Sequence, residues 1–263
     1  MKELILSLLL SSALAGLALW KKALTTGGLI LAWVLAVVIT FCGGIGAFAV
    51  LAAVFVCTIA AGKISGKKRE AVEAGLHAKA GKRDAVQIFC NVFVGALCLL
   101  LNALTHKTVF LWAYGGAMAA SLADSMASEL GVLSEKQPRD ILTLRPVQKG
   151  LSGGVTLLGF VPSLLGAVII GALCLLLRGA APSILPDAAA AGFFAAVCDS
   201  ILGSVAQVKY RCPVCGALTE KAVHCDMPGT PERGLLFVTN DTVNFINNVL
   251  GALAAAGLYF LHR

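Results

Sequence analysis

Charged residues are scarce in this sequence: they make up 13% of its 263 residues, against about 25% in a typical soluble domain. Long polar stretches are scarce as well, because 58% of the residues are hydrophobic and form long runs between short basic loops. This pattern excludes a single water-soluble core. It predicts an all-α, polytopic integral membrane protein, because each spanning helix needs about 20 apolar residues to satisfy its backbone inside a bilayer.

The sequence also lacks a basic stripe with interleaved aromatic residues, although its net charge is +7. Such a stripe is typical of proteins that bind nucleic acid, so we expect no nucleic-acid partner. The basic residues lie instead in the loops between apolar runs, where they set the topology and can contact anionic phosphate groups. We therefore expect membrane lipids and nucleotides as partners.

The apolar runs predict about eight spans within one membrane-embedded domain, residues 1–263. We expect the spans at residues 4–20, 27–42, 45–62, 86–104, 108–130, 154–178, 187–208 and 240–261. Only Gly43-Gly44 separates the second span from the third, so seven to nine helices remain open. All 21 Lys and Arg residues except Lys2, Lys107, Arg178 and Arg263 fall in alternate loops, which places both termini outside and these loops in the cytoplasm.

Four expected spans carry polar side chains on one face near their cytoplasmic ends. Charges inside membrane helices cost about 2.5–3.5 kcal/mol each on insertion scales, so they indicate function by default. The stripes contain Asn91, Asp124, Ser128, Glu129, Asp199, Asn240, Asp241 and Asn244. The topology predicts that all four stripes meet at one membrane depth.

The carboxylates of these stripes would repel one another without a cation. Hard oxygen ligands with open positions suit Mg²⁺, which takes its remaining ligands from water and substrate phosphates. We therefore predict a Mg²⁺ site at Asp124, Asp199 and Asp241. For any single Ser or Asn, hydrogen bonding between helices is an equal alternative.

A glycine-containing loop precedes the sixth expected span. Its residues Lys149, Ser152, Gly153 and Gly154 could bind phosphate through free N–H groups and a helix dipole. The spacing is not that of a Walker A motif, and a plain helix-capping loop explains it equally well. Basic residues before the fourth span, Lys82 and Arg83, are further candidates for neutralising phosphate.

Residues 209–235 form an expected cytosolic loop with four potential zinc ligands: Cys212, Cys215, His224 and Cys225. A Cys-x-x-Cys-Gly turn is typical of a zinc knuckle, in which the metal folds the loop and takes no part in chemistry. A disulfide is disfavoured in the cytosol. Unliganded thiols and a redox role remain alternatives to structural Zn²⁺.

Four motifs occur in order: ASLADSMASELG at 120–131, SGGVTLLG at 152–159, DSILG at 199–203 and NDTVNF at 240–245. Together they resemble the transmembrane protein 19 family (domain of unknown function 92), which includes the phytyl-phosphate kinases of plants. The resemblance covers about residues 25–260. Its motif positions in this chain are Asn91, Asp124, Glu129, Asp199, Asn240, Asp241 and Asn244.

The resemblance implies CTP-dependent phosphorylation of a prenyl monophosphate to the diphosphate at the cytoplasmic membrane face. Asp124, Asp199 and Asp241 would bind Mg²⁺, while Asn91, Asn240 and Asn244 would orient phosphates. An alcohol acceptor would require a general base, for which Glu129 or Asp124 is the candidate, whereas a monophosphate acceptor needs no base and Glu129 would then bind metal. The chain departs from the family pattern at Lys149–Gly154, where its residues differ from the usual glycine-rich motif.

Three other functions fit the same residues. A prenol or lipid kinase and a cytidylyltransferase would also use CTP, and the second would release pyrophosphate. A cation-coupled transporter would use the carboxylates as an ion path, but transport predicts carboxylates near the bilayer midplane. A scaffold is disfavoured, because buried carboxylates are costly without a function.

Overall fold

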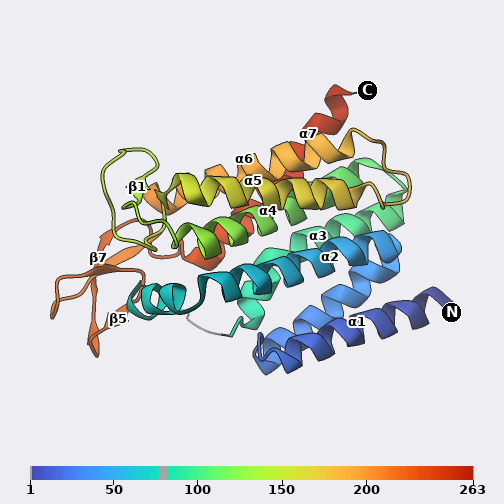
Figure 1. Cartoon of the computed structure of the whole chain (residues 1–263). Coiled ribbons are helices and arrows are strands. Elements are labelled where there is room, and N and C mark those ends of the chain that lie inside the picture. Colours follow the sequence, from blue (N-terminus) through green and yellow to red (C-terminus); the bar gives the residue numbers. More distant parts are fainter. Residues whose placement is uncertain (1, 77–81, 263) are drawn as a thin grey trace.

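The computed structural model describes residues 2–76 and 82–262, and seven helices account for most of them. The helices are α1 (Lys2–Trp20), α2 (Thr26–Leu76), α3 (Ala85–Thr105), α4 (Val109–Gly131), α5 (Leu157–Cys174), α6 (Ile184–Val205) and α7 (Asn240–Leu261). They pack side by side as an elongated bundle (Figure 1). Residues 77–81, part of the expected basic loop after the third span, lie outside the described residues.

Several helices begin where the sequence predicts, because capping side chains fix their first turns. Asp84 accepts a hydrogen bond from the Gln87 N–H, and Gln87 Oε1 accepts one from the Asp84 N–H. Thr239 and Thr242 form the same reciprocal box at the start of α7. Each box satisfies backbone donors that the helix itself leaves unpaired. The expected limits 86–104 and 240–261 are therefore close to those observed.

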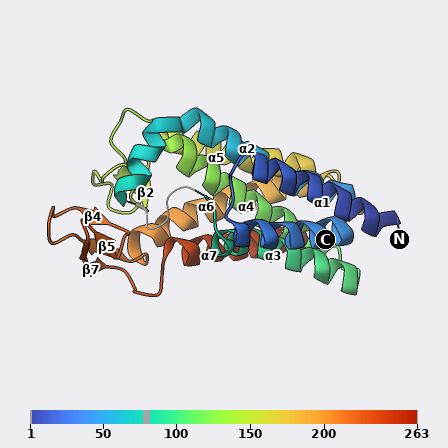
Figure 2. The ribbon, with the colours of Figure 1, turned by 90° about the horizontal axis from the view of Figure 1, so that it is seen from below.

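The second helix, α2, contains both the second and the third expected spans. Its backbone leaves the helical region at Gly44 (φ 71°) and again at Gly66 (φ 47°). A positive φ is easy for glycine because it has no Cβ. The chain reverses direction at Gly44, so the two parts of α2 run in opposite directions (Figures 1 and 2).

Within the described residues, six helices are long and apolar enough to cross a membrane. Residues 26–66 of α2 count as one of the six, and α4 is not among them. The expected count of eight is therefore not confirmed. The reason lies in two features: the break at Gly44, and the polar stripe of α4.

The central helix of the bundle is α4, which contacts α2, α3, α5, α6 and α7. Its backbone approaches the neighbouring helices closely at glycines. A Cβ on Gly116 would lie 2.1 Å from the Gly251 carbonyl oxygen of α7, and a Cβ on Gly192 of α6 would lie 2.4 Å from that of Ala119. Small residues at such contacts allow dense packing between membrane helices. Because its neighbours surround it, α4 can carry two carboxylates without exposing them to lipid.

The chain is mostly helical, as the sequence predicts, but seven short strands that the sequence does not predict lie between the helices. They are β1 (Arg139–Asp140), β2 (Gly154–Val155), β3 (Lys209–Arg211), β4 (Leu218–Thr219), β5 (Val223–His224), β6 (Met227–Pro228) and β7 (Thr230–Arg233). They form antiparallel sheets β1-β2, β4-β3-β7 and β5-β6.

Strand pairing also corrects the expected limits of two spans. Helix α5 begins at Leu157, not at 154, because β2 pairs with β1 and Thr156 then caps the helix by accepting the Gly159 N–H. It ends at Cys174, not at 178. Helix α6 covers Ile184–Val205, not 187–208; it ends early because Gln207 forms a β-bridge with Leu235 just before β3.

All the strands lie at one end of the bundle, which we call the strand-bearing end (Figure 1). Both views show the N-terminus and the C-terminus at the opposite end of the bundle (Figures 1 and 2). The loops with the glycines and the cysteines therefore share one end of the molecule.

Candidate functional site

A cavity of about 430 Å³ opens at the strand-bearing end, between helices α2 to α7 and the glycine-containing loop. It brings together most of the residues that the sequence singles out. Those lining it are Arg83, Asn91, Asp124, Ser128, Glu129, Lys149, Ser152, Gly153, Gly154, Asp199, Asn240 and Asn244. The convergence of the four stripes follows from the helical period and from the shared depth of their polar ends.

Two predicted site residues, Lys82 and Asp241, do not line this cavity. Lys82 is exposed to solvent, whereas its sequence neighbour Arg83 lines the cavity. Asn240 and Asn244 are four residues apart and share a helix face, whereas Asp241 is rotated by about 100° from Asn240. The cavity wall therefore offers Asp124, Glu129 and Asp199 as its carboxylates.

Glu129 is the most deeply buried of these carboxylates, with 8% of its surface exposed. Ser65 of α2 donates a hydrogen bond from its hydroxyl to Glu129 Oε2 at 3.3 Å. Gly62 of α2 also lies beside this carboxylate, since a Cβ there would be in ordinary van der Waals contact with the same oxygen, at 3.4 Å. The two helices α2 and α4 thus fix the position of Glu129.

Asp199 lies on α6, and its carboxylate is held near the negative charges of Asp124 and Glu220. Its Oδ2 atom is buried and has no hydrogen-bond partner among the described residues. A buried carboxylate oxygen in this state is costly unless a cation balances it. The donor set of hard oxygen ligands on a polar cavity wall fits Mg²⁺, with Asp124 and Asp199 as the residues that would hold it.

The polar side chains on α3 are tied together by hydrogen bonds. Asn91 Nδ2 donates to the Gln87 carbonyl at 2.8 Å, and Ser121 Oγ of α4 donates to Asn91 Oδ1 at 3.3 Å. This arrangement orients Asn91 towards the cavity beside the half-buried Arg83. The pair offers an amide and a guanidinium, both of which bind phosphate oxygens well.

The glycine-containing loop lies directly against α6. At Gly153 (φ 86°) a Cβ would lie 2.6 Å from Ser204 Cα, so this glycine is needed for close packing. Lys149 Nζ donates to the Ser134 carbonyl at 2.6 Å. The loop is therefore positioned by packing and hydrogen bonds, and its lysine is held at the cavity edge by the chain that follows α4.

Asp140 positions this loop and is a residue that the sequence analysis does not single out. It accepts hydrogen bonds from Ser204 Oγ at 2.6 Å and from the Leu142 and Thr143 N–H groups. Burial alone would raise the pKa of Asp140, but these hydrogen bonds outweigh it and lower the pKa to about 2. An Asp followed three residues later by Thr in a loop is a turn signal that could have identified it.

Lys209 and Glu220 are two further residues that the sequence does not reveal. The Ser152 N–H donates to Glu220 Oε1 at 3.0 Å, and Lys209 Nζ donates to the Ser152 carbonyl at 2.8 Å. Burial lowers the pKa of Lys209, although the charges of Glu220 and Asp140 act in the opposite direction. The cysteine-containing segment therefore holds both polar groups of the Ser152 backbone.

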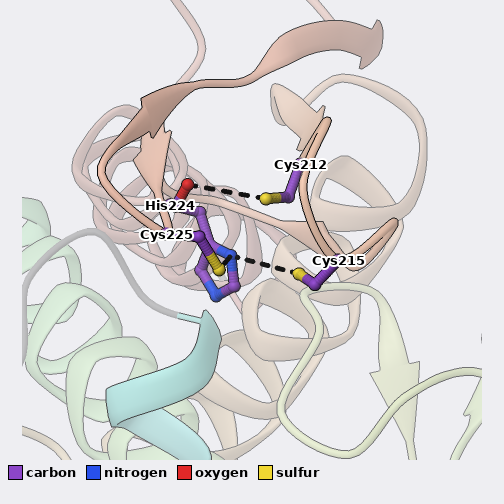
Figure 3. A group of neighbouring side chains, drawn as sticks. All are labelled: Cys212, Cys215, His224 and Cys225. Carbon is purple, nitrogen blue, oxygen red and sulfur yellow. Dashed lines mark hydrogen bonds between the residues drawn. The ribbon is translucent and has the colours of Figure 1, made fainter.

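The four predicted zinc ligands lie together in that segment (Figure 3). Their ligand atoms are all within 4.8 Å of one another. Hydrogen bonds, the largest from the Cys215 N–H, lower the pKa of Cys212 to about 6, whereas a hydrogen bond to the Cys215 side chain, with burial, raises that of Cys225 to about 11. One thiolate forms readily near neutral pH, and further thiolates need a neighbouring cation.

An apolar groove of about 70 Å³ adjoins the main cavity and is lined mainly by α1, α2 and α3. It shares Arg83, Gln87 and Asn91 with the main cavity. Along the rest of its length the lining is mostly apolar, including Leu14 and Ala15 of α1. The two spaces together offer a polar chamber joined to an apolar channel.

A family model described as "Integral membrane protein DUF92" matches residues 9–252. Protein PGR of Arabidopsis thaliana is 30% identical over 276 residues, which cover 94% of this chain and 93% of that protein. An uncharacterized membrane protein of Synechocystis is 30% identical over 246 residues, covering 90% of this chain and 83% of that protein.

Protein VTE6, chloroplastic, of Arabidopsis thaliana is 23% identical over 248 residues, covering 91% of this chain and 66% of that protein. No solved structure matches the chain. Both the family model and the full-length similarity to Protein PGR extend over nearly the whole bundle. The chain therefore belongs to the DUF92 family of integral membrane proteins, the transmembrane protein 19 and phytyl-phosphate kinase family that its motifs resemble.

Proposed function

We propose that this chain is a Mg²⁺-dependent kinase that converts a prenyl monophosphate, of the phytyl or polyprenyl type, to the diphosphate with CTP as donor. The observation that carries the proposal is the carboxylate cluster on the cavity wall. There Asp199 Oδ2 is buried without a partner among the described residues and lies near Asp124. The motif resemblance to a family that includes phytyl-phosphate kinases supports the choice of a prenyl phosphate and of CTP, and the similarity to Protein VTE6 agrees with membership of that family.

The shape of the site supports an amphiphilic substrate. In the proposal the apolar groove takes the first part of the prenyl chain, and Arg83 and Asn91, at the junction, bind its phosphate. The nucleotide enters from the strand-bearing end, where the exposed Asn240 and the nearby Asn244 line the cavity mouth. We propose that this end faces the cytoplasm, in accord with the basic loops.

Phosphoryl transfer depends mainly on positioning and on neutralising charge. Asp124 and Asp199 would hold Mg²⁺, which when bound neutralises phosphate oxygens and keeps donor and acceptor in line. Lys149 is held at the cavity edge by the Ser134 carbonyl and provides a further positive charge for the transferring group. The Ser152 and Gly154 N–H groups of the glycine-containing loop are already hydrogen-bonded, to Glu220 Oε1 and to the Leu151 carbonyl, so in this proposal the loop contributes mainly through Lys149.

Glu129 takes no proton in this proposal, because a prenyl monophosphate is already ionised near neutral pH. Its burial against α2 suits a role in which its negative charge, together with those of Asp124 and Asp199, attracts the cation. If Glu129→Gln retains turnover but changes the Mg²⁺ dependence, a base role is excluded. A prenol acceptor would require the opposite result.

The test uses purified protein, Mg²⁺, γ-labelled CTP and a panel of prenyl monophosphates and prenols. We expect label in a prenyl diphosphate, strongly reduced in Asp124→Asn and Asp199→Asn. Glu3→Gln is the matched control, since Glu3 is an exposed acidic residue of α1 far from the cavity.

The other outcomes identify the rival functions. Label in a prenyl monophosphate would indicate a prenol kinase, and release of labelled pyrophosphate would indicate a cytidylyltransferase. Absence of any transfer, together with carboxylate-dependent cation flux in liposomes, would overturn the kinase and favour a transporter. The position of the carboxylates towards one end of the bundle argues against that last outcome.

A further inference from the structure

The four residues of the cysteine cluster have the spacing of a tetrahedral metal site. Cys215 Sγ and Cys225 Sγ lie 3.5 Å and 3.3 Å from His224 Nδ1. A tetrahedral zinc ion with Zn–S of about 2.3 Å and Zn–N of about 2.0 Å would separate sulfur from nitrogen by about 3.5 Å. These two separations agree with that value within about 0.2 Å. All four ligand atoms lie within 4.8 Å of one another, so the more distant ones need to move closer by at most about 1 Å to bind the ion.

The backbone around the cluster is bent in a way that brings the ligands together. The Gly216 N–H donates to the Cys212 carbonyl, which closes the Cys-x-x-Cys-Gly turn. Cys225 and Asp226 both adopt positive φ, 53° and 57°, in the turn between β5 and β6. Such values are uncommon for residues other than glycine and persist where surrounding contacts impose them. The strained turn places Cys225 Sγ beside His224 (Figure 3).

Two strands connect this cluster to the cavity. Strand β3 ends one residue before Cys212, and β4 pairs with it on the other side of the turn. Lys209 begins β3, and Glu220 directly follows β4. These two side chains hold the carbonyl and the N–H of Ser152. Anything that fixes the turn at Cys212 therefore also fixes the backbone of the glycine-containing loop.

We propose that Cys212, Cys215, His224 and Cys225 bind one Zn²⁺, and that the bound ion positions the glycine-containing loop through Lys209 and Glu220. The protein supplies four ligands, so no coordination position is left for a substrate, which is typical of structural zinc. The strands here are two to four residues long, and none of their residues belongs to the hydrophobic core of the bundle. Ligation by a metal provides the stability that such a small segment lacks.

The first experiment measures the zinc content of the purified chain by inductively coupled plasma mass spectrometry. We expect about one zinc per chain in the wild type, and loss of zinc in Cys215→Ser and Cys225→Ser. The control is Cys42→Ala, which removes a thiol of α2 outside the cluster and should keep the zinc. A wild-type chain purified without added chelator and free of zinc would overturn the metal site.

The second experiment measures amide hydrogen exchange in residues 150–156 before and after zinc removal by a chelator. We expect faster exchange at the Ser152 N–H once zinc is lost. Glu220→Ala should produce the same local change while keeping zinc, because it leaves all four ligands in place. Unchanged exchange in the zinc-free chain would overturn the coupling. Neither readout measures phosphoryl transfer, so the inference stands or falls separately from the proposed kinase.

Discussion

Helix α6 carries one aspartate near each end, and the two differ sharply in their surroundings. Asp187, in the first turn, accepts a hydrogen bond from Trp112 Nε1 at 2.9 Å, and its other oxygen lies 3.0 Å from His262 Nε2. Asp199, three turns later, lies near the negative charges of Asp124 and Glu220, and its Oδ2 has no hydrogen-bond partner among the described residues.

The comparison distinguishes a carboxylate that stabilises the fold from one that the fold tolerates. Asp187 is 4% exposed, yet both of its oxygens have polar neighbours, so its burial is compensated locally. Around Asp199 Oδ2, the described residues provide the negative charges of Asp124 and Glu220 and no hydrogen-bond donor. Groups left unsatisfied in this way concentrate at functional sites, where a ligand completes them.

The sharpest test of the comparison is Asp199→Asn. We expect a fall in turnover on the order of 1,000-fold, because the proposed metal site would lose one carboxylate and its charge. The thermal midpoint of the metal-free chain should stay the same or rise, because repulsion with Asp124 is relieved. Turnover is measured with labelled CTP, and the midpoint by a thermal melt in detergent. A large fall in the midpoint would place Asp199 with Asp187 as a structural residue.

The opposite result is expected for Asp187→Leu. This change leaves the buried Trp112 Nε1 donor without its partner, which costs about 1–3 kcal/mol of stability. The residue lies at the end of α6 away from the cavity, so KM and kcat should change by less than twofold at a temperature where the chain is folded. A denaturation series in mixed micelles gives the stability. Full stability with lost turnover would contradict the assignment.

A third prediction concerns the apolar groove that adjoins the cavity containing Asp199. Ala15→Phe should fill the apolar groove and raise KM for long-chain prenyl phosphates by about tenfold, with little change in kcat. Ala13→Phe is the matched control, because Ala13 is on the same helix but exposed and outside the groove. Equal kinetics for the two variants would show that the prenyl chain lies elsewhere.

The smallest expected effect concerns a third carboxylate, Asp140, whose oxygens accept hydrogen bonds as those of Asp187 do. Its pKa is lowered from 3.8 to about 2, so its stabilising contribution is complete above about pH 4 and is lost as the pH falls towards 2. Asp140→Asn should therefore lower the thermal midpoint at neutral pH, and the difference from the wild type should shrink in that acidic range. A difference that is independent of pH would contradict this role of its charge.

Much of the candidate site could be predicted from helical periodicity. The polar stripes of α3, α4, α6 and α7 each have a period near 3.6, and the shared polarity of their ends correctly placed Asn91, Asp124, Asp199 and Asn244 on one cavity. Periodicity identifies which face of a helix is polar, but it does not show which residues of that face point into the cavity. For this reason Asp241 was included in the predicted site although it does not line the cavity.

The residues that the sequence did not reveal act through contacts between distant segments. Lys209 and Glu220 reach Ser152 across 57 and 68 residues of chain, and Asp140 reaches Ser204 across 64. No local pattern encodes such pairs. The short strands were missed for the same reason, since two-residue strands such as β1 and β2 exist only through their pairing.

The enclosed position of α4 has a consequence for the synthesis of the chain. Three of the helices that surround it, α5, α6 and α7, come later in the sequence, so they do not yet exist when α4 leaves the ribosome. Until these helices are synthesised and packed, Asp124 and Glu129 are only partly shielded from lipid, where each charge costs about 2.5–3.5 kcal/mol. We expect newly made α4 to wait beside the insertion machinery, and chains truncated before α5 to be degraded.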